Sequence, residues 1–170
     1  MPEVMKEKKE EKKEEKRVRI NDLHFDSEEI KFRKLDVSDH EDVIYVFYKK
    51  QMELDNEDKK QIKDILLFNL SYGCFASGML VGLILVWPDK LENEEIYSLF
   101  EPIIIFPYDK EKVFKTLIEY VEKEAKKNNV FKLSINVSNE NKKIINILNL
   151  LNFELYSKTE NDQTMVKSLQ

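Results

Sequence analysis

The chain has 170 residues, of which 42% are hydrophobic and 36% charged, and its formal net charge is −5. This length can bury one hydrophobic core, and the acidic balance argues against nucleic acids and anionic membranes as partners. The single cysteine, Cys74, excludes an internal disulfide, and two histidines provide no metal-ligand cluster. The longest apolar run, residues 79–87, is shorter than the ~20 residues that span a bilayer, and no apolar leader opens the chain. We therefore expect one cytoplasmic domain that uses no metal.

Residues 1–17 differ in composition from the rest of the chain. Residues 3–17 contain seven basic residues and six glutamates, and the charges that would be neighbours on a helix are alike. Such i,i+4 pairs repel one another, which weakens a helix. We expect a disordered Lys/Glu-rich tail, either a solubilising extension or an arm that binds a partner, followed by one domain over residues 18–170.

The first half of the domain reads as one strand, two helices and a hairpin. Residues 30–35 alternate between apolar and polar side chains, which predicts a half-buried strand. Ser38 and Glu41 have the spacing of a capping box that opens a helix, and Asp55 can cap a second one. Residues 72–77 and 80–87 flank a Ser-Gly-Met reversal and predict a β-hairpin whose second strand Pro88 ends.

The second half begins with a strand at residues 96–106, which Glu101-Pro102 interrupts because proline cannot donate to a strand ladder. From Lys112 the apolar period changes to 3.6, which predicts a long helix. The side chains of its apolar face are Phe114, Leu117, Ile118, Val121 and Ala125. A strand at 131–137, a helix at 141–151 and a closing hairpin follow. The helical connection predicts that strands 96–106 and 131–137 run parallel.

Two segments carry a resemblance to a known family. The fourth strand ends in Ile-Ile-Ile-Phe-Pro at residues 103–107, and the last helix is followed by Phe153. The residues at the family's motif positions in that last helix are Asn141, Ile144, Leu148 and Asn152. With the order of the elements, these segments resemble the GNAT N-acetyltransferase superfamily over residues 30–169. The resemblance implies an α/β (α+β) acyl-CoA N-acyltransferase fold with a mixed, mostly antiparallel sheet and helices on both faces.

The resemblance also implies a function, the transfer of acetyl from acetyl-CoA to an unidentified amine. Glu101 would be the general base, and Asn141 would donate a hydrogen bond to the coenzyme. The backbone of three residues would hold the pantetheine arm: Ile103, Ile104 and Ile105. The amides of four more would receive the pyrophosphate: Lys110, Glu111, Lys112 and Val113. From the residues alone, Glu101 reads equally as a solvated strand residue and Asn141 as a helix cap.

Two departures from the family pattern bear on activity. The phosphate loop of the family contains glycines, whereas residues 108–113 contain none and are about three residues shorter. Asp109 and Glu111 would repel phosphate, so we expect weak coenzyme binding. Leu148 stands where the family has a tyrosine that protonates the leaving thiolate. Tyr108 and Tyr156 read either as substitute acids or as packing residues. The sequence thus favours a divergent N-acetyltransferase slightly over an inactive binding or regulatory module, and leaves the oligomeric state open.

Overall fold

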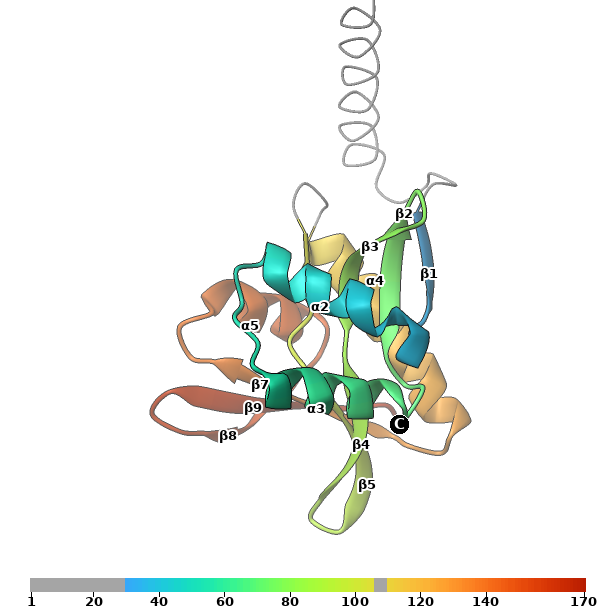
Figure 1. The fold of residues 1–170 in the computed structure, drawn as a ribbon. Coiled ribbons are helices and arrows are strands. Elements are labelled where there is room, and N and C mark those ends of the chain that lie inside the picture. Colours follow the sequence, from blue (N-terminus) through green and yellow to red (C-terminus); the bar gives the residue numbers. More distant parts are fainter. Residues whose placement is uncertain (1–29, 106–109) are drawn as a thin grey trace, which may run out of the picture.

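The computed structural model describes residues 30–105 and 110–170, and its strands form two sheets (Figure 1). The first sheet, in the order β1-β2-β3-β6, contains β1 (Ile30–Lys34), β2 (Tyr72–Ala76), β3 (Met79–Ile84) and β6 (Ile103–Ile104). The second, in the order β4-β5-β7-β9-β8, contains β4 (Val86–Leu91), β5 (Glu94–Leu99), β7 (Lys132–Ser138), β9 (Asp162–Ser168) and β8 (Glu154–Lys158). Residues 1–17, predicted as a separate tail, lie outside the described residues.

Helices cover both faces of the strands, as predicted. The helices are α2 (His40–Lys49), α3 (Asn56–Leu66), α4 (Lys110–Lys127) and α5 (Lys142–Leu150), and a 3-10 turn, η1 (Val37–Asp39), precedes α2. Alternating side chains of the strands divide the core in two. Phe75 and Ile103 pack with α2 and α3 on one face, whereas Cys74 and Ile104 pack with α4 and α5 on the other. Within the described residues, no helix is long and apolar enough to cross a membrane.

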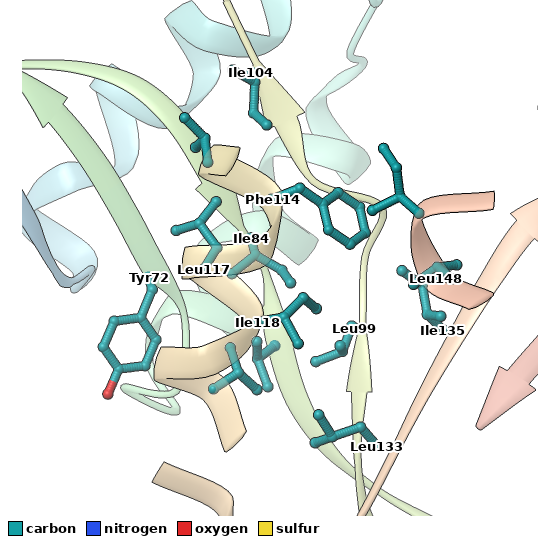
Figure 2. Packing of buried hydrophobic residues seen from close by; sticks show 14 of the residues in the cluster. Tyr72, Ile84, Leu99, Ile104, Phe114, Leu117, Ile118, Leu133, Ile135 and Leu148 are labelled. Carbon is teal, nitrogen blue, oxygen red and sulfur yellow. The ribbon is translucent and has the colours of Figure 1, made fainter. Parts of the chain in front are cut away.

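The long helix α4 carries the predicted apolar face. Its five predicted core residues, Phe114, Leu117, Ile118, Val121 and Ala125, are all at most 1% exposed. Figure 2 shows α4 laid against the strands with Leu117 and Ile118 pointing towards them, and Leu148 contributed from α5. Asn129 (φ 58°) and Asn152 (φ 69°) follow α4 and α5 in the left-handed conformation that asparagine tolerates.

The predicted capping box of α2 is wrong by two residues. The cap residue is Asp36 rather than Ser38. The Asp36 side chain accepts a hydrogen bond from the Ser38 amide, and the Asp39 side chain accepts one from the Asp36 amide (3.0 Å). The reciprocal pair therefore surrounds η1, and α2 begins at His40. For α3 the prediction holds, because Asp55 caps it in a capping box with Asp58.

Pro88 does not end a strand. The predicted strand 80–87 divides at Leu85 between β3 of the first sheet and β4 of the second, and β4 continues through Pro88 to Leu91. Because β4 is the edge strand of its sheet, the missing N–H of Pro88 need not cost a ladder bond. A tight turn at Glu92 (φ 52°) and Asn93 (φ 66°) then joins β4 to β5.

The predicted interruption at Glu101-Pro102 is confirmed, and it moves the chain from one sheet to the other. Before it, β5 pairs with β7 in parallel, from Tyr97 opposite Leu133 to Leu99 opposite Ile135, as the helical connection predicted. After it, β6 pairs with β3 of the first sheet instead of continuing beside β7. The two halves of the predicted fourth strand therefore diverge at residues 100–102.

Candidate active site

The divergence of β5 and β6 leaves one edge of β6 without a partner strand among the described residues. The Ile105 amide donates to the Val81 carbonyl of β3 (2.8 Å), so Ile105 and Ile103 direct their peptide groups towards β3. Peptide groups alternate along an antiparallel ladder, and the N–H and C=O of Ile104 therefore point towards the open edge. Of the three isoleucines predicted to hold pantetheine, Ile104 offers its backbone there.

Glu101 lies at the point of divergence and is half-buried. The side-chain amide of Asn141 donates to its carboxylate, with 2.5 Å between Nδ2 and Oε1. The same Asn141 side chain caps α5, because its Oδ1 accepts from the Ile144 amide (3.3 Å). The cap interpretation of Asn141 is thus confirmed. Its side chain also joins the start of α5, which follows β7 of the second sheet, to Glu101, which precedes β6 of the first sheet.

A cavity of about 250 Å³ lies beside Glu101. Its lining comes from the end of α2, the loop after it, the divergence itself and the first residue of α4: Lys50, Met52, Phe100, Glu101, Pro102, Ile103, Ile104 and Lys110. Four of the predicted site residues, Glu101, Ile103, Ile104 and Lys110, therefore line one cavity. Ile105, Glu111, Lys112, Val113 and Asn141 are not among its lining residues.

Burial and charge act in opposite directions on the ionisable groups of this cavity. Burial raises the pKa of Glu101 above its usual 4.5, although the Lys110 charge and the bond from Asn141 lower it. Burial likewise lowers the pKa of Lys110 below 10.5, which the Glu101 charge opposes, and the charges of Lys50 and Lys143 lower it further. A carboxylate whose pKa is raised is a better proton acceptor at neutral pH.

The first turn of α4 begins at this cavity, which Lys110 lines. Val113 is buried, Glu111 is exposed, and Lys110 and Lys112 are half-buried. A Cβ added to Gly82 of β3 would lie 3.2 Å from Cγ1 of Val113, so this glycine lets α4 begin close to the sheet. The free amides of a first turn attract anions. Residues 106–109, which include Tyr108 and Asp109, lie outside the described residues.

Tyr156, the one candidate for a general acid among the described residues, does not line the cavity, and neither does Leu148. Leu148, at the family's tyrosine position, is fully buried in the core near Ile135 (Figure 2). Tyr156 is exposed on β8 and donates to Glu92 (2.7 Å) at the turn between β4 and β5. Among the described residues, no cluster of histidine, cysteine, aspartate and glutamate side chains could hold a metal ion.

Lys50 and Met52 are site residues that sequence reasoning missed. They belong to the end of α2 and the loop after it, and they meet Glu101 only through the packing of α2 against β3 and β6. No motif marks them. In the structure, Gln51 between them has a φ of 57°, which marks the end of the helix.

The order of the elements, the helices on both faces and the strand that leaves its parallel neighbour define the fold of GNAT N-acetyltransferases. No protein-family model matches the sequence. No curated protein is similar to it in sequence. The likeness is instead to solved structures. Because the three described next are less than 25% identical to this chain, their likeness establishes the fold alone.

Three solved structures illustrate this likeness. PaiA N-acetyltransferase from Thermoplasma acidophilum, in complex with coenzyme A, has a TM-score of 0.66 and 21% identity, over 82% of this chain and 98% of that one. The Drosophila melanogaster polyamine N-acetyltransferase, which forms N-acetylagmatine, has a TM-score of 0.71 and 11% identity, over 82% and 100%. Arabidopsis thaliana Naa50, in complex with the bisubstrate analogue CoA-Ac-MVNAL, has a TM-score of 0.66 and 13% identity, over 82% and 99%.

Proposed function

We propose that this protein is an N-acetyltransferase that moves acetyl from acetyl-CoA to an amine, with Glu101 as general base. The observation that carries the proposal is the position of Glu101. Its half-buried carboxylate lines a cavity between the open edge of β6 and the first turn of α4. An amine in this cavity would meet the base on one side and a thioester lying along β6 on the other. The coenzyme A complexes of similar structures support acetyl-CoA as the donor.

The coenzyme would use the two features that flank Glu101. The pantetheine arm would lie along β6, where the peptide groups of Ile104 are directed to the open edge and Ile103 and Ile105 fix the strand against β3. The pyrophosphate would bind at the first turn of α4. Its ligands there would be the amides of Lys110, Glu111, Lys112 and Val113, with the two lysine side chains adding charge. The amide of Asn141 has two N–H donors, so one can bond Glu101 and the other the arm.

The reaction follows from these positions. Glu101 would take a proton from the acceptor ammonium, directly or through one water molecule. The neutral nitrogen would then attack the thioester carbonyl, so that a C–N bond forms and the C–S bond breaks, and the nitrogen would release a second proton to water as it becomes the amide. Leu148 cannot donate a proton, so the thiolate would be protonated by water or by the proton that Glu101 has taken.

Exchange of Glu101 tests this proposal. Glu101→Gln keeps the size and the hydrogen bonding of the side chain but cannot accept the proton. We expect thiol release from acetyl-CoA, followed over a panel of amines, to fall by about 10²–10⁴-fold while the Kd for coenzyme A stays unchanged. Glu119→Gln, an exposed position on α4, is the control and should retain full turnover. Undiminished turnover of Glu101→Gln would remove Glu101 from the mechanism.

The alternative is an inactive binding or regulatory module with the same fold. Two observations favour it: the buried leucine at the family's tyrosine position and the absence of glycine from residues 108–113. Such a module would release no thiol with any amine. Binding of acetyl-CoA to such a module is measured separately from thiol release, by the shift in melting temperature.

A further inference from the structure

The cavity beside Glu101 adjoins a larger groove of about 760 Å³ between α2, the loop after it and α3. Met52 lines both hollows, and Lys50 of the cavity lies in sequence between two residues of the groove, Lys49 and Gln51. An acceptor that lies in the groove would pass Met52 to reach Glu101. Lys50 lines the cavity side of this path.

The charges along this path are mostly positive. The cavity is lined by one carboxylate, Glu101, and by two cations, Lys50 and Lys110. The groove adds Lys49 and Lys59 against Glu53. The described lining residues of the two hollows therefore include twice as many cations as anions. Lys50 and Lys110 line the same cavity, and the charge of Lys50 contributes to the lowered pKa of Lys110.

We infer that the acceptor is an amine that carries a carboxylate close to its amino group, and that polyamines are poor acceptors. This inference rests on the proposed function. With Lys110 engaged by the coenzyme pyrophosphate, the cavity retains one carboxylate for the amine and one cation, Lys50, for an anionic group next to it. A polyamine would place a second ammonium near Lys50, where the described lining of the cavity offers no second carboxylate to bind it. The carboxylate of the groove, Glu53, is accompanied there by the cations Lys49 and Lys59. A free acidic amino acid and the N-terminus of an acidic peptide both carry the required pair of charges.

The test compares matched acceptors after binding of acetyl-CoA has been measured. Thiol release is followed with free glutamate, with a tripeptide that has Glu at its second position, with the same tripeptide carrying Gln, and with spermidine. We expect kcat/KM for the better glutamate-containing acceptor to exceed that for the Gln tripeptide about fivefold and that for spermidine by more. Calorimetry of the same acceptors with the coenzyme A-saturated protein should give the same order of Kd. The two glutamate-containing acceptors separate a free amino acid from a peptide.

Two variants assign the effect to Lys50. Lys50→Glu should reverse the preference between the Glu and Gln tripeptides, because it replaces an attractive charge by a repulsive one, and should leave the Kd for acetyl-CoA unchanged. Lys126→Glu makes the same charge change 16 residues after Lys110 along α4, about 24 Å away, and should leave the preference as in the wild type.

Three results would overturn the inference. Spermidine as the better acceptor would refute it and leave acetyl transfer intact. Loss of acetyl-CoA affinity in Lys50→Glu, with the acceptor preference unchanged, would assign Lys50 to the coenzyme instead. Turnover with none of these amines despite normal binding of acetyl-CoA would contradict it as well, whereas absence of acetyl-CoA binding would remove the proposed function itself.

Discussion

Asn141 combines two tasks in one side chain. Its Oδ1 caps α5 by accepting from the Ile144 amide, and its Nδ2 donates to the Glu101 carboxylate. A hydrogen bond to the charged form of a carboxyl group lowers its pKa, whereas burial raises it. At Glu101 burial is the larger of the two effects, so the pKa lies above 4.5. Asn141 therefore limits a rise that would otherwise be greater, and it orients the carboxylate while doing so.

Asn141→Ser separates the two tasks. Serine is as good a helix cap as asparagine, but it would not supply the amide donor to Glu101. The pKa of Glu101 should then rise further, and since the base must be ionised, the acid limb of kcat/KM against pH should move to higher pH. The pH–rate profile measures this shift. Asn149→Ser, at an exposed position of α5, is the control. An unmoved acid limb would show that Asn141 does not act through Glu101.

At the scale of elements, an ion pair joins β1 to the start of α2. Arg33 of β1 donates to both carboxylate oxygens of Asp39, at 2.9 and 2.8 Å, and its guanidinium carbon lies 4.1 Å from the centre of the Phe75 ring. The Asp39 side chain is 7% exposed and that of Arg33 is 51% exposed. The bond from Arg33 is the main reason that the pKa of Asp39 lies below its usual 3.8. This pair holds η1 in place, and with it the entry to the helix that supplies Lys50.

Asp39→Asn should therefore destabilise the fold. Hydrogen bonds to charged groups are worth about 1.5–3 kcal/mol, and the exposure of Arg33 places the expected loss of unfolding free energy at about 1–2 kcal/mol at neutral pH. Because the folded pKa of Asp39 is lowered, this stability is present above 3.8 and is lost as the pH falls through the folded pKa. Urea unfolding should show the wild type and the variant converging in acid. Asp64→Asn, exposed on α3, should match the wild type throughout.

At the scale of the whole molecule, the proposed coenzyme site is shared between the two sheets. The open edge of β6 belongs to the first sheet, whereas Asn141 follows β7 of the second. A ligand that binds across this divergence contacts only the folded arrangement, so its binding free energy adds to the stability of the entire domain. Coenzyme affinity can therefore be measured as global stability, without an identified acceptor.

We expect acetyl-CoA at millimolar concentration to raise the melting temperature, since a hundredfold excess over Kd adds about 2.7 kcal/mol. Without glycine in residues 108–113 and with Glu111 in the first turn, binding should be weak, so micromolar acetyl-CoA should have little effect. The joint change of Lys110 and Lys112 to Glu should reduce the rise, but should alter the response to a pantetheine analogue without phosphates much less. No shift at several millimolar acetyl-CoA would leave the inactive module as the function of this fold.

The sequence by itself determined the features that depend on neighbouring residues. The apolar period of α4 places Phe114 and Leu117 on one face whatever surrounds the helix, and Pro102 cannot donate to a ladder in any fold. Asn152 ends α5 at positive φ for an equally local reason, the tolerance of its short side chain for that conformation. These local features were enough to reveal the resemblance, and through it to predict Glu101 as the general base.

Tertiary structure decided what depends on distant partners. Pro88 stays in a strand because β4 lies at the edge of its sheet, and the capping pair sits at Asp36 and Asp39 where Arg33 of β1 can reach it. The cavity follows the same rule. Lys50 enters it from α2, roughly fifty residues before Glu101, because α2 packs against β3 and β6. Spacing along the chain carries no record of such contacts, since they arise only when the helices and sheets bury their apolar faces together.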